Sequence, residues 1–138
     1  MPIRPGSSFE HYEILAPLGK GEMGEVYLAR DAKLERQAVL KILAADFTQS
    51  QNRLRRFAPE AKAVSALNHP NIIIIHEIGA HNGTHFITTE HLAGQALRDR
   101  LQQPLAQTEA LDIALQIAAY LASSARHGVI KEESYECK

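Results

Sequence analysis

Residues 18–30 read Leu18-Gly19-Lys20-Gly21-Glu22-Met23-Gly24-Glu25-Val26-Tyr27-Leu28-Ala29-Arg30, and this stretch decides the fold. Its three glycines follow the GxGxxG spacing that several phosphate-binding folds share. A Rossmann turn needs a helix directly after the glycines, whereas EVYLAR alternates like a strand. A Walker A loop ends in Lys and then Ser or Thr, whereas Gly24 is followed by Glu25. The glycines therefore predict a β-hairpin, either an ordinary tight turn or one whose backbone N–H groups approach phosphate oxygens.

Strands are predicted on both sides of this turn. Before it, Tyr12, Ile14 and Leu18 recur at even spacing. After it, residues 25–30 alternate, and residues 37–43 (QAVLKIL) predict a third strand. Two strands around a glycine turn and a third strand next in sequence predict an antiparallel meander.

The second half of the chain combines helices with two more strands. Apolar residues three and four apart in residues 53–67 predict an amphipathic helix, and Pro59 is tolerated if it lies in the first turn. The other predicted elements are strands at 72–78 and 85–89 joined by a turn at 81–84, and helices at 97–101 and 108–126. This order of elements predicts an α+β fold with a five-stranded antiparallel sheet.

Lys41 is the main candidate for a functional side chain outside the turn. It shares a strand face with Val39, because side chains two positions apart point the same way. A lysine on an apolar strand needs an anionic partner when it is buried, and Glu60 on the next helix could supply one. Such a pair is weak evidence for stability, since desolvation can outweigh the attraction. We therefore interpret Lys41, Glu60 and the glycine turn as a clamp for phosphate; the alternative is a lysine that reaches out to water.

Six segments carry ordered motifs over most of the chain. They are residues 12–27 (strand, glycine loop, strand), 38–41 (strand with lysine), 57–61 (helix with glutamate), 67–72 (LNHPNI), 88–92 (TTEHL) and 112–130 (long helix). Together they resemble the bacterial serine/threonine protein kinases of eukaryotic type. The resemblance runs from about Phe9 to Ile130. It implies a kinase small lobe, with a five-stranded sheet plus one helix, followed by an incomplete helical large lobe.

The resemblance implies an ATP site in the small lobe. In such kinases the glycine loop covers the ATP phosphates, and the strand lysine holds the α- and β-phosphates while paired to the helix glutamate. It thus implies catalytic roles for Lys41 and Glu60. The implied ATP contacts are Leu18 and Val26 around adenine, Gly19, Lys20, Gly21, Glu22, Met23, Gly24 and Glu25 at the phosphates, Val39 against the adenine face, Lys41, Thr89 at the back pocket, and the backbone of Glu90 and Leu92 at the adenine edge.

Three residues depart from the family pattern around this site. Val39 stands where a small residue is usual, and its extra methyl groups would press on the adenine face. Glu22 replaces a frequent glycine and brings negative charge towards the phosphates. Pro59 directly precedes Glu60 and puts the local helix geometry in question.

The largest departure follows the long helix. Alignment on Gly128-Val129-Ile130 places Lys131, Glu132 and Glu133 where the family has its catalytic His-Arg-Asp. The family's asparagine position falls on Lys138, and the sequence contains no Asp-Phe-Gly. Mg²⁺ is expected for the family, but its ligands are absent here, so no metal ligand is assigned.

We therefore expect a truncated kinase domain. Its predicted divisions are a tail at 1–9, the ATP-binding small lobe at 10–92, the first large-lobe helices at 93–130 and an unrelated tail at 131–138. Phosphate transfer by this chain alone is not expected. The alternatives are a pseudokinase-like module that binds nucleotide or a partner protein, and a non-functional gene fragment. A partner would cover the apolar stripe of the long helix, which should otherwise stay exposed.

Composition excludes several other classes. Lys and Arg number 15 against 16 Asp and Glu, so the chain has no net positive charge that would favour binding to nucleic acid. The only cysteine is Cys137, which excludes an intrachain disulfide and a zinc site built on cysteine pairs. The longest aliphatic run, Ile72–Ile75, is too short to span a membrane, and residues 1–9 lack the apolar run of a signal peptide. We expect a cytoplasmic protein.

Overall fold

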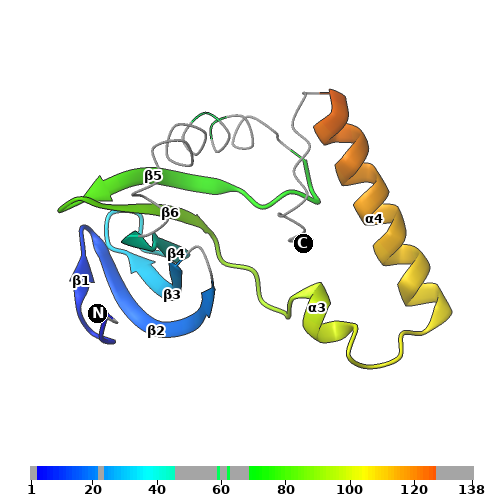
Figure 1. Cartoon of the computed structure of the whole chain (residues 1–138), viewed down its shortest axis with the longest axis horizontal. Coiled ribbons are helices and arrows are strands. Elements are labelled where there is room, and N and C mark those ends of the chain that lie inside the picture. Colours follow the sequence, from blue (N-terminus) through cyan, green and yellow to red (C-terminus); the bar gives the residue numbers. More distant parts are fainter. Residues whose placement is uncertain (1–2, 22–23, 46–58, 60–61, 63–68, 127–138) are drawn as a thin grey trace. The chain divides into compact units, whose positions relative to one another are not determined.

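The structure is a computed structural model that describes residues 3–21, 24–45, 59, 62 and 69–126 (Figure 1). Two compact units make up the chain. Residues 1–61 and 75–91 form the first unit, and residues 62–74 and 92–138 form the second. The predicted helix at 53–67, with Glu60, lies almost wholly outside the described residues, as do Glu22, Met23 and residues 127–138.

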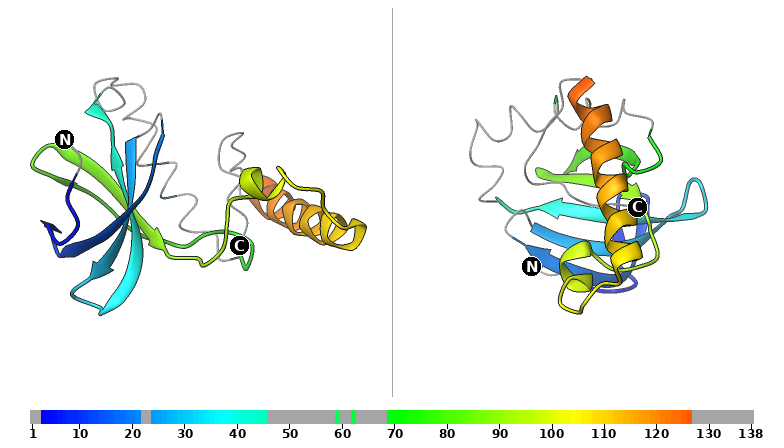
Figure 2. Two further views of the ribbon diagram at one scale, coloured as in Figure 1. Left: turned by 90° about the horizontal axis from the view of Figure 1, so that it is seen from below. Right: turned by 90° about the vertical axis from the view of Figure 1, so that its right-hand side faces the viewer.

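The first unit is an antiparallel sheet. Its strands are β1 (Ser8–Phe9), β2 (Tyr12–Gly21), β3 (Gly24–Asp31), β4 (Arg36–Leu43), β5 (Ile75–His81) and β6 (Thr84–Glu90). They lie side by side in the order β1-β2-β3-β4-β6-β5, and the first view of Figure 2 shows them crossing at an angle, as in a twisted sheet. The α+β fold and the meander of β2, β3 and β4 are confirmed.

The prediction of five strands is wrong, because a sixth strand forms at the N-terminal side. Ser8 and Phe9 pair with Glu13 and Tyr12 across a two-residue turn. The turn holds Glu10 at a φ of 55°, a left-handed conformation that sequence patterns do not predict for glutamate. The turn places Phe9, which is 8% exposed, in the core, so these residues form part of the sheet.

The strand predicted at 72–78 begins later, at Ile75. The amide of Ile72 donates to the His69 carbonyl at 3.1 Å, so a turn occupies the start of the aliphatic run. An unbroken run of isoleucines has no alternation to mark where a strand begins. The predicted turn at 81–84 is confirmed, with Asn82 and Gly83 at φ values of 50° and 78°.

The two faces of the sheet differ in burial. Residues directly opposite in antiparallel strands point to the same face. The core face is buried and carries Phe9, Tyr12, Ile14, Tyr27, Ala29, Ala38, Leu40 and Phe86. The half-exposed face carries two rows across β3, β4 and β6, namely Val26-Lys41-Ile87 and Leu28-Val39-Thr89. The alternation predicted for residues 25–30 is thereby confirmed.

The sheet curls until its two edges meet. Strands β2 and β5 lie near opposite edges of the sheet, yet the Tyr12 hydroxyl donates to Glu77 Oε2 at 2.6 Å. The same hydroxyl lies 3.1 Å from Thr88 Oγ1 on β6. Burial, and then the bond to Glu77, raise the pKa of Tyr12 to about 12, so the hydroxyl keeps its proton and donates it. We call this junction of β2 and β5 the seam.

The second unit contains two helices, α3 (Leu97–Arg100) and α4 (Gln107–Arg126). Both predicted helices are confirmed to within one residue at each end. The Arg100 guanidinium joins them by donating to Glu109 at 3.1 and 2.7 Å, a two-pronged charged pair. No helix within the described residues is long and apolar enough to cross a membrane.

Candidate functional site

The glycine hairpin is built by β2 and β3, with Gly19 opposite Val26 and Gly21 opposite Gly24. The pairing skips a residue between Pro17 and Gly19, so Leu18 is a bulge. Its side chain is 51% exposed, whereas Tyr12 and Ile14 are buried in the core. A second skipped residue, between Ile14 and Ala16, breaks the even spacing that the sequence shows from Tyr12 to Leu18.

The three glycines of the hairpin stand in different surroundings. A Cβ atom on Gly24 would overlap the Ile42 carbonyl oxygen and lie 2.8 Å from the Ala44 nitrogen. Gly24 also has a φ of 139°, which other residues rarely adopt. At Gly19 and Gly21 a Cβ would meet nothing within 4 Å, and neither adopts a left-handed φ. Packing therefore requires glycine at position 24 and leaves open space beside the other two.

Lys41 lies on β4, opposite Val26 on β3 and Ile87 on β6. It is half-buried on the half-exposed face, away from the aromatic core. Val39 lies on the same face, as the two-residue period predicts. The expected pairing of Lys41 with Glu60 falls outside the described residues.

The row next to Lys41 runs from Leu28 through Val39 to Thr89. Thr89 is 4% exposed, and its hydroxyl donates to the Glu90 carbonyl at 3.3 Å. Val39 therefore lies between the apolar Leu28 and the buried Thr89, in the middle of the half-exposed face. Glu90 ends β6, and Leu92 follows in the second unit.

Glu25 and Lys20 point to the other side of the hairpin. The Glu25 carboxylate accepts a hydrogen bond from the Tyr27 hydroxyl and lies 4.0 Å from the Lys20 ammonium. The Tyr27 hydroxyl in turn accepts from the backbone N–H of Ile3 at 3.0 Å. Burial, followed by the hydrogen bond to Glu25, raises the pKa of Tyr27. These contacts give the side chain of Glu25 a packing role on the core face.

The comparison with known families fits this arrangement of strands, glycines and lysine. The family model described as protein kinase domain matches residues 12–131. The chain belongs to the protein kinase family.

Bacterial serine/threonine-protein kinases are among its curated relatives. PrkC of Bacillus subtilis (strain 168) is 35% identical over 124 residues, covering 88% of this chain and 19% of PrkC. PknF of Mycobacterium tuberculosis is 38% identical over 125 residues, covering 88% of this chain and 26% of PknF. The chain therefore spans about a fifth to a quarter of the length of these kinases.

Solved kinase structures share the fold. The crystal structure of the Mycobacterium tuberculosis PknI kinase domain superposes with a TM-score of 0.80 and 27% identity. The match covers 92% of this chain and 52% of that kinase domain. The protein-kinase fold expected from the sequence motifs is thus confirmed.

The residues around the seam were not found by sequence reasoning. The His11 ring packs on Tyr12 with centroids 4.1 Å apart, and its Nε2 lies 3.4 Å from Glu77 Oε2 and 3.8 Å from Asp31 Oδ1. Asp31 is 3% exposed and accepts the backbone N–H groups of Lys33 and Leu34. No local motif marks these residues, because His11 and Glu77 are brought together only by the curl of the sheet.

Proposed function

We propose that this chain is the ATP-binding part of a serine/threonine protein kinase. One observation carries the proposal: Gly19 and Gly21 leave open space beside their backbone, while Lys41 lies half-buried opposite Val26 on the neighbouring strand. Gly19 pairs with the same Val26, so the hairpin and the lysine belong to one continuous part of the sheet. Open backbone beside a lysine suits an anionic group such as a phosphate.

ATP fits the residues present. The backbone N–H groups at Gly19 and Gly21 would approach its phosphates, because no Cβ stands in the way. Lys41 would hold the phosphate charge, and the exposed Leu18 and the half-buried Val26 would cover the adenine. The bulge at Leu18 supports this role, since bulges re-aim side chains next to binding sites. Mg²⁺ would accompany the nucleotide.

Phosphate transfer by the 138-residue chain is not part of this proposal. Transfer depends on metal ions and on a carboxylate that orients the acceptor. Lys131 and Glu132 stand at two of the three catalytic-loop positions. Lys138 stands at the position of the metal-binding asparagine, and a lysine cannot ligate a hard cation. Glu133 has the charge of the usual aspartate, with one extra methylene group.

Titration calorimetry with ATP and Mg²⁺ tests the binding proposal. We expect weak binding, and Lys41→Met should weaken it at least about tenfold, because a hydrogen bond to a charged group contributes roughly 1.5–3 kcal/mol. The matched control is Lys33→Met, in the exposed β3–β4 turn, which should bind like the unaltered chain. Equal affinity of the Lys41→Met variant and the control would contradict the assignment.

Incubation with labelled ATP and Mg²⁺ or Mn²⁺ tests the absence of transfer. The expected result is no label on the chain or on a basic substrate protein above background. Incorporation that disappears in the Lys41→Met variant would overturn this expectation and would make Glu133 the next residue to substitute.

The apolar stripe of α4 favours a second function, the docking of a partner protein. Leu111 and Leu115 are 59% and 70% exposed, and they lie four residues apart on one helix face. Large exposed apolar patches mark interaction or aggregation sites. A monomeric chain that fails to bind a hydrophobic dye would contradict this second proposal.

A further inference from the structure

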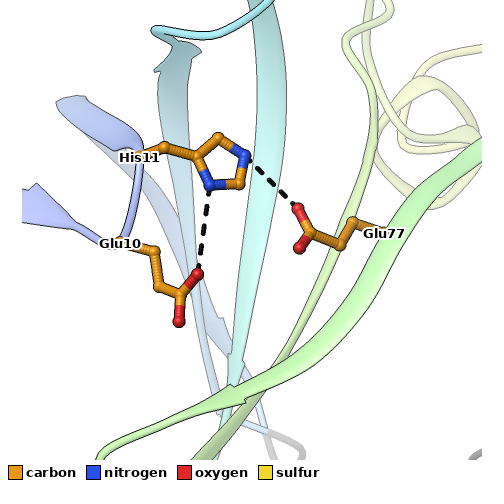
Figure 3. A group of neighbouring side chains, drawn as sticks. All are labelled: Glu10, His11 and Glu77. Carbon is orange, nitrogen blue, oxygen red and sulfur yellow. Dashed lines mark ion pairs between the residues drawn. The ribbon is translucent and has the colours of Figure 1, made fainter.

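Three side chains that can ligate a metal meet where the sheet closes on itself. Glu10 and His11 form the β1–β2 turn, and Glu77 lies on β5, near the opposite edge of the sheet (Figure 3). The figure shows the His11 ring between the two carboxylates. None of these residues belongs to the proposed ATP site, so they need an explanation of their own.

The spacing of these ligand atoms suits one metal ion. One nitrogen of His11 and one oxygen of each glutamate lie within 4.8 Å of one another. His11 Nε2 and Glu77 Oε2 are 3.4 Å apart. Two ligands of a tetrahedral zinc ion with bonds of about 2.1 Å lie roughly 3.4 Å apart, so this pair already has the required separation. Glu10 Oε2 lies 3.9 Å from the other ring nitrogen, Nδ1, and Glu10 Oε1 lies 3.2 Å from His81 Nδ1. To join Glu77 at Nε2, the Glu10 side chain, which is 34% exposed, would have to turn away from both contacts.

The surroundings hold the first two ligands in place. The His11 ring is 16% exposed and packs against Tyr12, whose hydroxyl donates to Glu77 at 2.6 Å. Hydrogen bonds of this kind to a ligating carboxylate orient metal ligands in proteins. The buried Asp31 carboxylate lies 3.8 Å from His11 Nε2, but its other oxygen lies 3.8 Å from Arg36 Nε, which offsets part of its charge. A cation at this point would therefore be attracted mainly by Glu10 and Glu77.

We propose that Glu10, His11 and Glu77 bind a divalent transition-metal ion such as Zn²⁺, which joins the β1–β2 turn to β5. Imidazole nitrogen and carboxylate oxygen are both zinc ligands, whereas Mg²⁺ prefers six oxygen ligands. The ion would act as a structural clip, because it binds two ends of a sheet that are 66 residues apart in sequence. This site is separate from the Mg²⁺ that accompanies ATP, and it stands whether or not the ATP proposal does.

The test uses the full chain with Cys137→Ser, so that no thiol competes for the metal. Cobalt(II) is the first probe, because a tetrahedral site gives strong visible absorption, and Zn²⁺ should displace it. We expect one ion per chain. His11→Gln and Glu77→Gln should each weaken binding at least about tenfold, since even the loss of a partner of a metal ligand costs ten- to a hundredfold. Glu77→Gln keeps an oxygen acceptor for the Tyr12 hydroxyl.

The matched control is His91→Gln, which removes a histidine just after β6, outside the cluster. It should bind cobalt and zinc like the parent chain. Zn²⁺ should also raise the unfolding temperature of the parent and of the control, but not that of His11→Gln, because only a ligand of the folded state stabilises it. Two results would overturn the proposal: no saturable cobalt absorption in a folded parent chain, or equal affinity in the parent and the His11→Gln variant. In either case the cluster consists of ion pairs only.

Discussion

The two faces of the curled sheet are built from the same strands but differ in how deeply their side chains are buried. On the core face Tyr12, Ile14 and Leu40 are almost fully buried, and Tyr12 ties β2 to β5 and β6. On the half-exposed face Val39 and Lys41 are only partly covered within the same strand, β4. Packing explains the residues of the core face. It does not explain a half-buried lysine at position 41, and this is why we propose a binding role for the half-exposed face.

The glycines of the hairpin also differ in whether packing requires them. Gly24 is needed because β4 passes too close for any Cβ, whereas Gly19 and Gly21 have room for one. The GxGxxG pattern thus combines one glycine that packing requires with two that it does not, and these two are the ones we propose lie at the nucleotide. Substitutions on the two faces should therefore differ in what they change, either the stability of the fold or the binding of nucleotide.

Gly24→Ala should be the most damaging substitution. Its Cβ would collide with backbone of β4, which cannot move aside as a flexible side chain could, and the φ of 139° adds strain. We expect a loss of about 3 kcal/mol or more in the free energy of unfolding, measured by chemical denaturation. A variant as stable as the parent would show that Gly24 is not required by packing.

Tyr12→Phe should weaken the seam. It leaves the ring in the core but removes the hydroxyl that contacts Glu77 and Thr88. A loss of about 1–3 kcal/mol in the free energy of unfolding is expected, because the buried Thr88 hydroxyl and the half-buried Glu77 carboxylate each lose this partner. Tyr120→Phe, on α4, is the matched control and should change stability by less than about 0.5 kcal/mol. Equal stabilities would contradict the role given to the seam.

Alkaline pH should affect the core face through Tyr27. Its pKa is raised above the ordinary 10.0 by burial and by Glu25, so the folded state favours the protonated hydroxyl. The resulting stability is fully present below pH 10.0 and is lost as pH rises through the folded-state pKa. Unfolding measured at several pH values should therefore show a steeper alkaline loss for the parent than for Tyr27→Phe. Parallel curves would be evidence against the buried Tyr27–Glu25 contact.

Gly21→Ala should have the smallest effect on stability and a clear effect on nucleotide binding. The added Cβ meets nothing, and removing a glycine from a compatible backbone can stabilise a protein by about 0.4–1 kcal/mol. ATP affinity should nevertheless fall, because the methyl group would stand between the backbone and a phosphate. Chemical denaturation measures the stability of this variant and titration calorimetry its ATP affinity, so the two effects can be separated. Unchanged affinity would remove Gly21 from the proposed site.

Local patterns predicted the parts of the fold that local physics controls. The alternation of EVYLAR fixed which residues face the core, and Asn82-Gly83 predicted its hairpin because both residues tolerate positive φ. Lys41 and Val39 were placed on one face by the two-residue period alone. Kinase motifs then predicted the fold that the comparisons confirm.

Features that depend on distant contacts were missed. The short strand at Phe9 forms because its ring fills the core, although the residues before it read as a tail. The bulge at Leu18 has no local sequence signal, and neither has the hydrogen bond from the Tyr27 hydroxyl to the Glu25 carboxylate. The seam joins Tyr12 to Glu77, 65 positions along the chain, which no periodicity can reveal.

We propose above that nucleotide binds to the half-exposed face. Titration of the isotope-labelled chain with a non-hydrolysable ATP analogue and Mg²⁺, with backbone amide shifts recorded by NMR, tests this binding directly. We expect shifts at Gly19, Gly21, Val39 and Lys41, and none at Phe9 or Phe86 on the core face. Shifts confined to the core face, or no shifts at saturating analogue, would contradict it.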